Sequence, residues 1–214
     1  MKFLYSLSGA NHPVIKEFRI NKTDKFVMGK AVRVSTDGIL GHNIIGKCLG
    51  VAAENHTGEK DILNPRADGE TVRIDITHGG VYSVPVPKVS VTASSSSGFS
   101  CSSTGITSSV MGMKAVLVAK GDNSENTDSV GTERTITDAS ISGTTITLTV
   151  SGIGTVSVGD VYAIVPNTGY KGYLAEDCES FLFSGGTGID LMVVKYNEAN
   201  ETLDVLLGSK QFDI

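Results

Sequence analysis

An excess of β-branched side chains constrains the fold of this chain more than any other feature. Its 214 residues include 23 valines, 16 isoleucines and 20 threonines, against 13 leucines and 5 methionines. A branched Cβ loses χ1 freedom in a helix but packs well on a pleated sheet. The 25 glycines and a charged fraction of only 19% suit short strands and turns. The composition therefore predicts an all-β protein.

The charge of the chain bears on its partners. The formal net charge is −5, whereas nucleic-acid binding usually needs a concentrated basic face. We therefore expect no nucleic-acid partner. Residues 1–88 carry a net charge of +3, and residues 89–170 and 171–214 carry −3 and −5. This asymmetry hints at head-to-tail contact between subunits, over distances limited by screening to about 8–10 Å.

The cysteines and the hydrophobic runs bear on the compartment. Cys48, Cys101 and Cys178 are too few and too scattered for a disulfide framework or a zinc site, so we expect them to be reduced and buried. The apolar stretch in residues 1–7 is too short for a secretory signal, and the chain lacks a run of about 20 apolar residues. These features predict synthesis in the cytoplasm and no membrane partner.

Three parts of the chain differ in pattern. Residues 1–25 lack a sustained period and contain His12-Pro13, which predicts an extended N-terminal arm; a disordered terminus or a strand of the same domain is the alternative. Residues 92–109 are rich in serine, threonine and glycine and predict a linker or a mobile loop. We expect an inserted β module over 89–155, including that linker, and a main β domain over 26–88 and 156–214.

Alternation and turn residues predict the strands of both units. The segments 71–76 and 81–86 flank Thr77 to Gly80, which predicts a hairpin, and a second hairpin is expected around residues 197–200. Residues 157–164 resemble 27–34, which predicts two similar half-barrels unless the resemblance is due to chance. The one helix candidate is 174–183, with loop and strand as the alternative. Strands are also expected over 26–34, 44–53, 115–119, 134–137, 144–150, 190–196 and 202–207.

Two motifs approach known ligand-binding patterns without completing them. Residues 41–48 nearly match a phosphate-binding loop, but Cys48 stands where serine or threonine would meet magnesium, and a strand pattern follows. The second motif has the spacing of a calcium-binding loop, although Thr127 replaces the glycine of the sharp turn, so a solvated acidic loop is preferred. Its oxygen-bearing residues are Asp122, Ser124, Asn126, Asp128 and Glu133.

Other candidate catalytic groups lack a recognisable arrangement. No serine lies in a G-x-S-x-G elbow, and the acidic group Glu176, Asp177 and Glu179 is typical of a solvated face. The histidines are far apart in sequence and do not form an H-E-x-x-H pair: His12, His42, His56 and His78. The sequence therefore predicts a protein that is not an enzyme and that holds no cofactor or metal.

Several β segments resemble the small head-decoration, or capsid-cementing, proteins of tailed bacteriophages. The resemblance lies in Phe26 to Val34, Gly46 to Ala53, Gly58-Glu59, Thr71 to Ile76 and Val156 to Val165. It implies a β-sandwich or a tulip-like barrel without a cofactor. It also implies a homotrimer bound to the major capsid protein on the outside of the virion, where it stabilises the shell.

In that family an extended N-terminal segment commonly lies along the capsid. An arm with open backbone groups can add a strand to the edge of a partner's sheet. A tail-tube or baseplate subunit and a carbohydrate-binding adhesin are the alternative functions; the lack of tryptophan argues against the adhesin. The residues that the arm offers for capsid contact are Phe3, Leu4, Tyr5, Leu7, Val14, Ile15 and Phe18.

Overall fold

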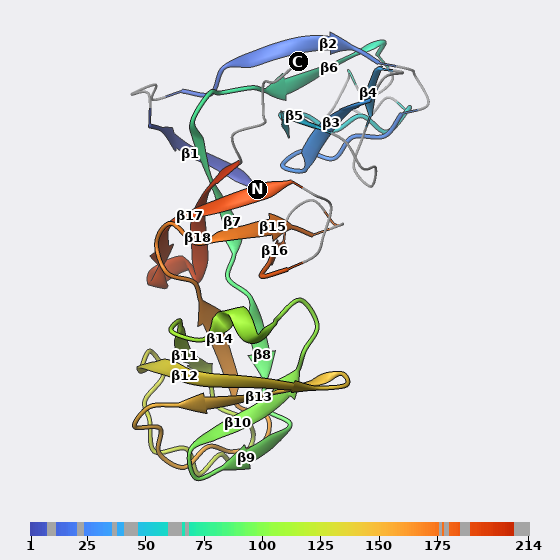
Figure 1. The fold of residues 1–214 in the computed structure, drawn as a ribbon. Helices are drawn as coiled ribbons and strands as arrows, with labels where there is room; N and C mark the ends of the chain where they lie inside the picture. Colours follow the sequence, from blue (N-terminus) through green and yellow to red (C-terminus); the bar gives the residue numbers. More distant parts are fainter. Residues whose placement is uncertain are drawn as a thin grey trace.

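Three antiparallel β-sheets are stacked along the long axis of the molecule (Figure 1), and we call them the upper, middle and lower sheets. The computed structural model describes residues 1–7, 12–20, 24–35, 38–40, 47–59, 66, 69–175, 177, 180–184 and 189–207. Within these ranges, helical residues are confined to two single turns of 3-10 helix, η1 (Ser108–Val110) and η2 (Glu198–Asn200). The predicted all-β fold class is confirmed.

The upper sheet has five strands in the order β2-β6-β5-β3-β4 and covers a small core of its own. Phe26, Val32 and Ile74 are among the buried members of this core. Gly50 is required where β5 passes β6, because a Cβ there would lie 2.1 Å from the carbonyl oxygen of Asp75. The strands are β2 (Ile15–Arg19), β3 (Ala31–Ser35), β4 (Gly38–Leu40), β5 (Lys47–Ala52) and β6 (Thr71–Asp75).

The middle sheet has six strands in the order β1-β7-β18-β17-β15-β16. Its strands β17 and β18 pair around η2, so the predicted C-terminal hairpin is confirmed. Tyr82 of β7 is fully buried between the edge strand β1 and the rest of the sheet's core. The strands are β1 (Lys2–Ser6), β7 (Gly80–Pro85), β15 (Lys171–Leu174), β16 (Phe181–Leu182), β17 (Asp190–Asn197) and β18 (Thr202–Leu207).

The lower sheet has seven strands in the order β8-β14-β11-β12-β13-β10-β9 and curls around its buried face. Phe99 of β10 stacks on Tyr162 of β14 with ring centroids 4.5 Å apart, although these strands are not neighbours in the sheet. The strands are β8 (Lys88–Ser90), β9 (Ala93–Ser95), β10 (Gly98–Ser102), β11 (Lys114–Ala119), β12 (Glu133–Ser142), β13 (Thr145–Val150) and β14 (Val161–Val165).

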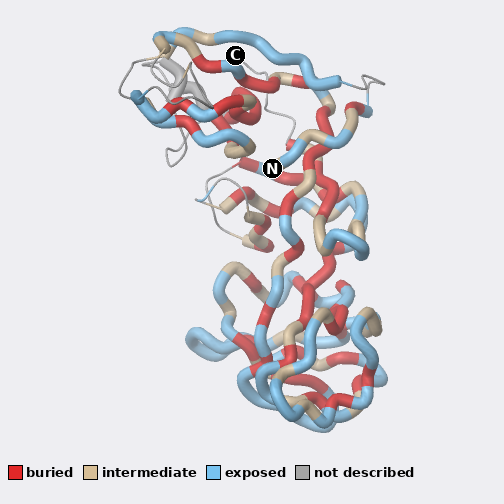
Figure 2. Tube along the Cα trace, turned by 180° about the vertical axis from the view of Figure 1, so that it is seen from behind, coloured by how far each residue is buried: buried red, intermediate tan, exposed pale blue. Residues whose placement is uncertain are grey.

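One hydrophobic core continues from the middle sheet into the lower sheet. Buried residues run down the centre of the molecule (Figure 2). The loop before η1 contacts the middle sheet, where the Phe183 N–H donates to the carbonyl oxygen of Gly105 at 3.1 Å. Gly105 has a φ of +71°, and a Cβ there would lie 2.5 Å from Leu182. The two sheets are therefore packed together and are not merely tethered.

The prediction of a free arm over residues 1–25 is wrong for the part that the structure describes. Residues 2–6 form β1, which pairs with β7, and residues 15–19 form β2, which pairs with β6. Each strand has only five residues, which is too short to produce a sustained period in the sequence. Both lie at the edge of a sheet of the same chain.

The predicted hairpin over 71–86 is also wrong. β6 belongs to the upper sheet and β7 to the middle sheet, so the turn at residues 77–80 carries the chain from one sheet to the other. The Asp75 carboxylate accepts the backbone N–H of Thr77 at 3.0 Å, and Gly79 has a φ of +63°. The sequence correctly predicts a turn at residues 77–80. This turn connects strands of two different sheets and does not close a hairpin.

Three further expectations differ from the structure. The supposed linker over 92–109 contains β9 and β10, whose apolar residues Phe99 and Cys101 are buried. β14 pairs with β8 and β11 in the lower sheet, whereas the sequence placed residues 156–165 in the main domain. The helix candidate over 174–183 is wrong, because Leu174 ends β15 and residues 181–182 form β16.

The expected internal repeat is only local. β3 and β14 each follow a glycine with positive φ, +84° at Gly29 and +89° at Gly159. Beyond this turn the two segments differ, because β3 pairs with β4 and β5 while β14 pairs with β8 and β11. The described strands therefore do not form two similar half-barrels.

Candidate interaction surface

The apolar side chains near the N-terminus divide into inward-facing and outward-facing groups. The Phe3 ring packs against Tyr82 with centroids 5.8 Å apart, and Phe18 packs against the core of the upper sheet. Tyr5 is half-buried. The outward-facing group is Leu4, Leu7, Val14 and Ile15, of which Leu7 is the most exposed at 61%.

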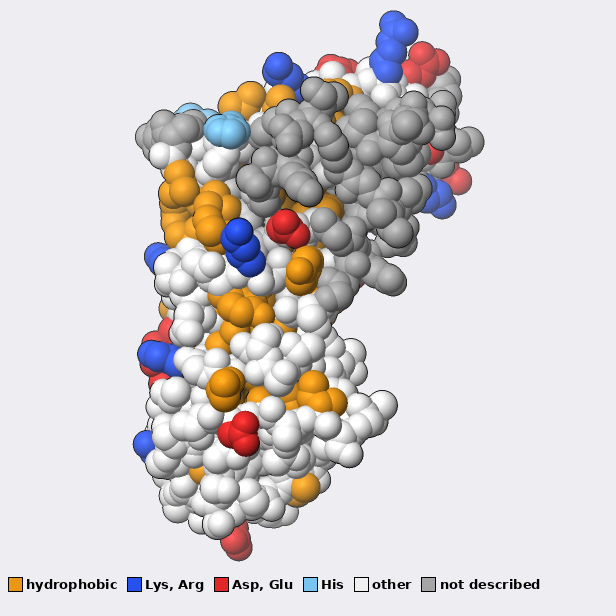
Figure 3. Space-filling model, in the orientation of Figure 1, with side chains coloured by type: hydrophobic (Ala, Val, Ile, Leu, Met, Phe, Trp, Pro, Cys, Tyr) orange, Lys and Arg blue, Asp and Glu red, His pale blue; other side chains and the backbone are white. Residues whose placement is uncertain are grey.

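The turn between the upper and middle sheets brings Leu7 and Val14 to one place. The Leu7 N–H donates to the carbonyl oxygen of Gly79 at 3.0 Å, and the Val14 N–H donates to the Thr77 hydroxyl at 2.7 Å. On the face drawn in Figure 3, hydrophobic side chains gather over β1 beside exposed histidine. We call Leu4, Leu7, Val14, Ile15 and His78 the turn surface.

A buried carboxylate fixes the backbone beneath the turn surface. Asp75 is 4% exposed, and one of its oxygens accepts both the N–H and the hydroxyl of Thr77, at 3.0 and 2.5 Å. Its other oxygen accepts the Tyr82 hydroxyl at 3.0 Å. Since Thr77 in turn accepts the Val14 N–H, the strand β2, the turn and the middle sheet are joined by one chain of hydrogen bonds.

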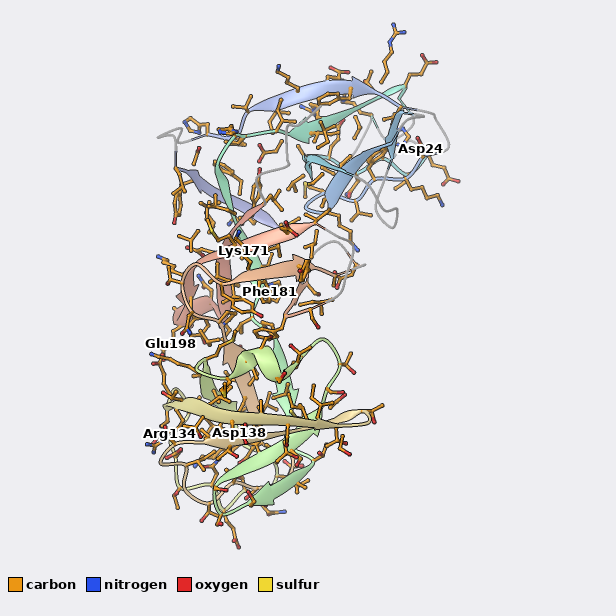
Figure 4. The ribbon with its side chains drawn as sticks, in the orientation of Figure 1. Asp24, Arg134, Asp138, Lys171, Phe181 and Glu198 are labelled. Carbon is orange, nitrogen blue, oxygen red and sulfur yellow. The ribbon has the colours of Figure 1, made fainter. Side chains whose placement is uncertain are left out.

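The candidate calcium loop has a different arrangement, in which its side chains other than that of Asp122 are bound by protein groups. The Asn126 side chain donates to Asp160 at 2.7 Å and to the Tyr162 hydroxyl at 2.9 Å. Asp128 accepts two hydrogen bonds from Arg134, at 2.6 and 3.1 Å, and Figure 4 labels this arginine on the lower sheet. Glu133 pairs with Lys114. These side chains therefore hold the loop together through contacts with other protein groups.

Asp160 is the organising residue that the sequence did not reveal. It is fully buried and accepts the N–H groups of Gly121 and Ser157 at 2.9 and 3.0 Å, in addition to Asn126. Burial alone would raise the pKa of its carboxyl group, but the hydrogen bonds from Gly121, Ser124, Asn126 and Ser157 together hold that pKa below the ordinary value. The carboxylate therefore stabilises the loop in its ionised form.

The remaining candidate residues are not brought together where the structure describes them. His12 and His78 are exposed, whereas the ring nitrogens of buried His56 lie 2.7 and 2.8 Å from the carbonyl oxygens of Asp24 and Gly69. Asp177 accepts the Ser180 N–H at 2.8 Å. Residues 41–46, including His42, and also Glu176, Cys178 and Glu179, lie outside the described residues.

Two features are absent from the described ranges: a metal-binding cluster and a membrane-spanning helix. Within them, no group of three or more histidine, cysteine, aspartate or glutamate residues is placed to hold a metal ion. No helix of the described chain is long and apolar enough to cross a membrane.

The thiol of Cys101 is expected to resist modification in the folded protein. Cys101 is 1% exposed, and burial raises the pKa of its thiol to about 11. Because the thiolate is the reactive form, iodoacetamide at pH 8 should alkylate Cys101 only after denaturant unfolds the chain. Peptide mass spectrometry measures this, with alkylation in denaturant as the positive control. Rapid alkylation without denaturant would contradict the burial of β10.

Comparisons with known proteins do not assign the chain to a family. A scan against protein-family models gave no match, and searches of curated proteins and of solved structures gave none either.

Proposed function

We propose that this protein is a structural component of a tailed-bacteriophage head, which binds the outer surface of the capsid lattice as a homo-oligomer and stabilises the shell. The observation that carries the proposal is the turn surface, where exposed apolar side chains stand on a backbone held by Asp75, Thr77 and Gly79. A surface fixed in this way loses little conformational freedom on binding. The resemblance of the β segments to capsid-cementing proteins implies the major capsid protein as the partner.

Repetition would make weak contacts effective. A capsid shell presents many identical sites, and an oligomer presents several turn surfaces. Linked binding events of this kind raise the overall affinity by about 10² to 10⁴ over a single contact, provided that the spacing of the sites permits simultaneous binding. The N-terminal residues then act as part of a folded surface and not as the free arm that the sequence predicts.

Replacing Leu7 with aspartate is expected to weaken binding to expanded, undecorated capsids of the source phage by about 10- to 100-fold. Burial of a leucine side chain contributes about 1.5–3 kcal/mol, and a charge in its place adds a desolvation cost. Cosedimentation of the full-length protein with capsids at several concentrations measures the affinity. Val158→Asp is the matched control, because Val158 is also 61% exposed but precedes β14 in the lower sheet.

Other outcomes would point elsewhere. Absence of binding by the unchanged protein, with intact capsids, would remove the proposal. Equal losses for Leu7→Asp and Val158→Asp would show that the turn surface is not the contact. If the protein alone forms rings or tubes in negative-stain images, the tail-tube or baseplate function is favoured instead.

A further inference from the structure

The outer edge of β2 has open backbone hydrogen-bonding groups. Two bonds fix its pairing with the neighbouring strand: the Ile76 N–H donates to the carbonyl oxygen of Val14 at 2.9 Å, and the Ile20 N–H to that of Glu70 at 3.0 Å. Because inward and outward groups alternate along an antiparallel strand, residues 14, 16, 18 and 20 face β6. The N–H and C=O groups of Ile15, Glu17 and Arg19 therefore point outward. None of the described strands pairs with this edge.

The side chains of β2 present two different faces. Ile15, Glu17 and Arg19 lie on one face and are exposed, whereas Phe18 lies on the other face and packs against the core of the upper sheet. In Figure 1 the strand runs along the top of the molecule, and Figure 2 shows its chain as mostly exposed. A second strand can therefore approach this edge along its length.

The exposed edge of β2 carries two opposite charges, those of Glu17 and Arg19. Glu17 is bound by Arg66 at 2.6 Å and by the Thr71 hydroxyl, yet its side chain remains 49% exposed. These hydrogen bonds, from Thr71 first and then Arg66, lower the pKa of Glu17, so its carboxylate is ionised near neutral pH. In the described part of the chain, Arg19 has no hydrogen bond or ion pair. The edge thus carries one positioned anion and one available cation, two residues apart.

Only a few antiparallel registers allow this edge to pair with itself. Outward-facing residues must lie opposite outward-facing residues, which leaves three registers that overlap three or more residues of β2. The first register places Glu17 opposite Glu17, and the two negative charges repel each other. The second register places Ile15 opposite Glu17 and therefore Lys16 opposite Lys16, so two positive charges repel each other. In the third register Glu17 lies opposite Arg19 on both sides of the axis, and Phe18 lies opposite Phe18. Charge and backbone geometry agree in that register alone.

We propose that two copies of this chain pair antiparallel through β2, with Glu17 of each copy opposite Arg19 of the other and the two Phe18 side chains at the two-fold axis. Each of the two Glu17 and Arg19 pairs exchanges two backbone hydrogen bonds, so four main-chain bonds join the copies. The two upper sheets become one continuous sheet, in which the outward backbone groups of Glu17 and Arg19 are paired on both copies.

This contact is separate from the proposed function and can be tested without capsids. A two-fold contact uses the same patch on both copies and closes at two, so it cannot by itself build a threefold ring. In a homotrimer another surface would form the ring, and the β2 contact would link neighbouring trimers. Leu4, Leu7 and His78 of the turn surface lie outside β2 and would remain available for the capsid.

Charge exchange at β2 tests the pairing. We expect sedimentation equilibrium of the full chain to show reversible association of two monomers into a dimer. If the protein is a homotrimer, we expect reversible association of trimers with one another. Arg19→Glu places two glutamates opposite each other and should weaken this association about tenfold or more, and Glu17→Arg should do the same by placing arginines opposite each other. An equimolar mixture of the two variants should associate again, because every opposing pair then carries opposite charges.

The controls separate a lost contact from a lost fold. Arg19→Glu removes no hydrogen bond or ion pair to a described residue, so its thermal unfolding should match that of the unchanged protein. Lys171→Glu reverses a charge in the middle sheet (Figure 4), away from β2, and should leave association unchanged. The proposal would be overturned if the unchanged protein did not associate or if Arg19→Glu associated normally. It would also be overturned if an equimolar mixture of the two variants, both folded, did not associate.

Discussion

Replacing Asp160 with alanine is expected to lower the free energy of unfolding by about 3–5 kcal/mol. The substitution leaves the N–H groups of Gly121 and Ser157 and the side-chain amide of Asn126 without their buried acceptor. Each buried donor without a partner costs about 1–3 kcal/mol. Equilibrium unfolding in urea, followed by circular dichroism, measures the loss. The loop at residues 121–128 should also become sensitive to proteases.

The same carboxylate predicts how stability depends on pH. Since the pKa of Asp160 is lower in the folded protein than its ordinary value of 3.8, its stabilisation is fully present above that value. The stabilisation is lost as the pH falls below it toward the folded pKa. Asp160→Asn should therefore flatten the fall in stability below about pH 4.

Asp122→Ala is the matched control for Asp160. Asp122 lies in the same loop but is exposed and has no hydrogen bond in the described structure. Its replacement should change the free energy of unfolding by less than about 0.5 kcal/mol. If both variants had the same small effect, the Asp160 network would not stabilise the lower sheet.

Replacing Tyr82 with alanine is expected to cost about 3–5 kcal/mol, as is usual when a large buried aromatic side chain is truncated. Tyr82 is fully buried, its ring packs against Phe3, and its hydroxyl donates to Asp75. The variant therefore loses packing in the middle sheet and a bond to the upper sheet. Thermal unfolding should occur at a lower temperature and over a broader range.

Tyr82→Phe tests the hydroxyl, because it keeps the ring and removes the group that donates to Asp75. Its expected cost is about 1–2 kcal/mol. Tyr173→Phe provides the comparison, since Tyr173 is half-buried and its hydroxyl has no partner in the described structure, so no loss is expected. Equal stability of Tyr82→Phe and Tyr173→Phe would contradict the role of Asp75.

The sequence predicts best those strands whose alternation is strong. The C-terminal hairpin is confirmed. Its strands β17 and β18 are consecutive in the sequence and pair with each other. At residues 71–86 the turn residues were equally clear, but the partners of β6 and β7 are distant in sequence and local patterns do not encode them. In β10 the serines of a supposed linker hid the alternation of Phe99 and Cys101, which is the signal that would have identified the strand.

The candidate surface was predicted only as a set of residues. The apolar residues near the N-terminus were identified, but Leu7 and Val14 come together only because each bonds the turn at residues 77–80. The outward groups of β2 depend on its register with β6, which the sequence does not give. Likewise Asp160 and Asn126 are 34 positions apart, and nothing in the local sequence links them.

The strands through which the chain enters and leaves the lower sheet are neighbours. β8 pairs with β14, and the Ile164 N–H donates to the carbonyl oxygen of Pro87 at 2.9 Å. Paired strands lie about 5 Å apart, so the chain enters and leaves the lower sheet at neighbouring positions. A different domain could be grafted between residues 87 and 166 while the other two sheets keep their connectivity. The graft would have to supply apolar side chains in place of Ile106 and Val110, which belong to the core shared with Phe181.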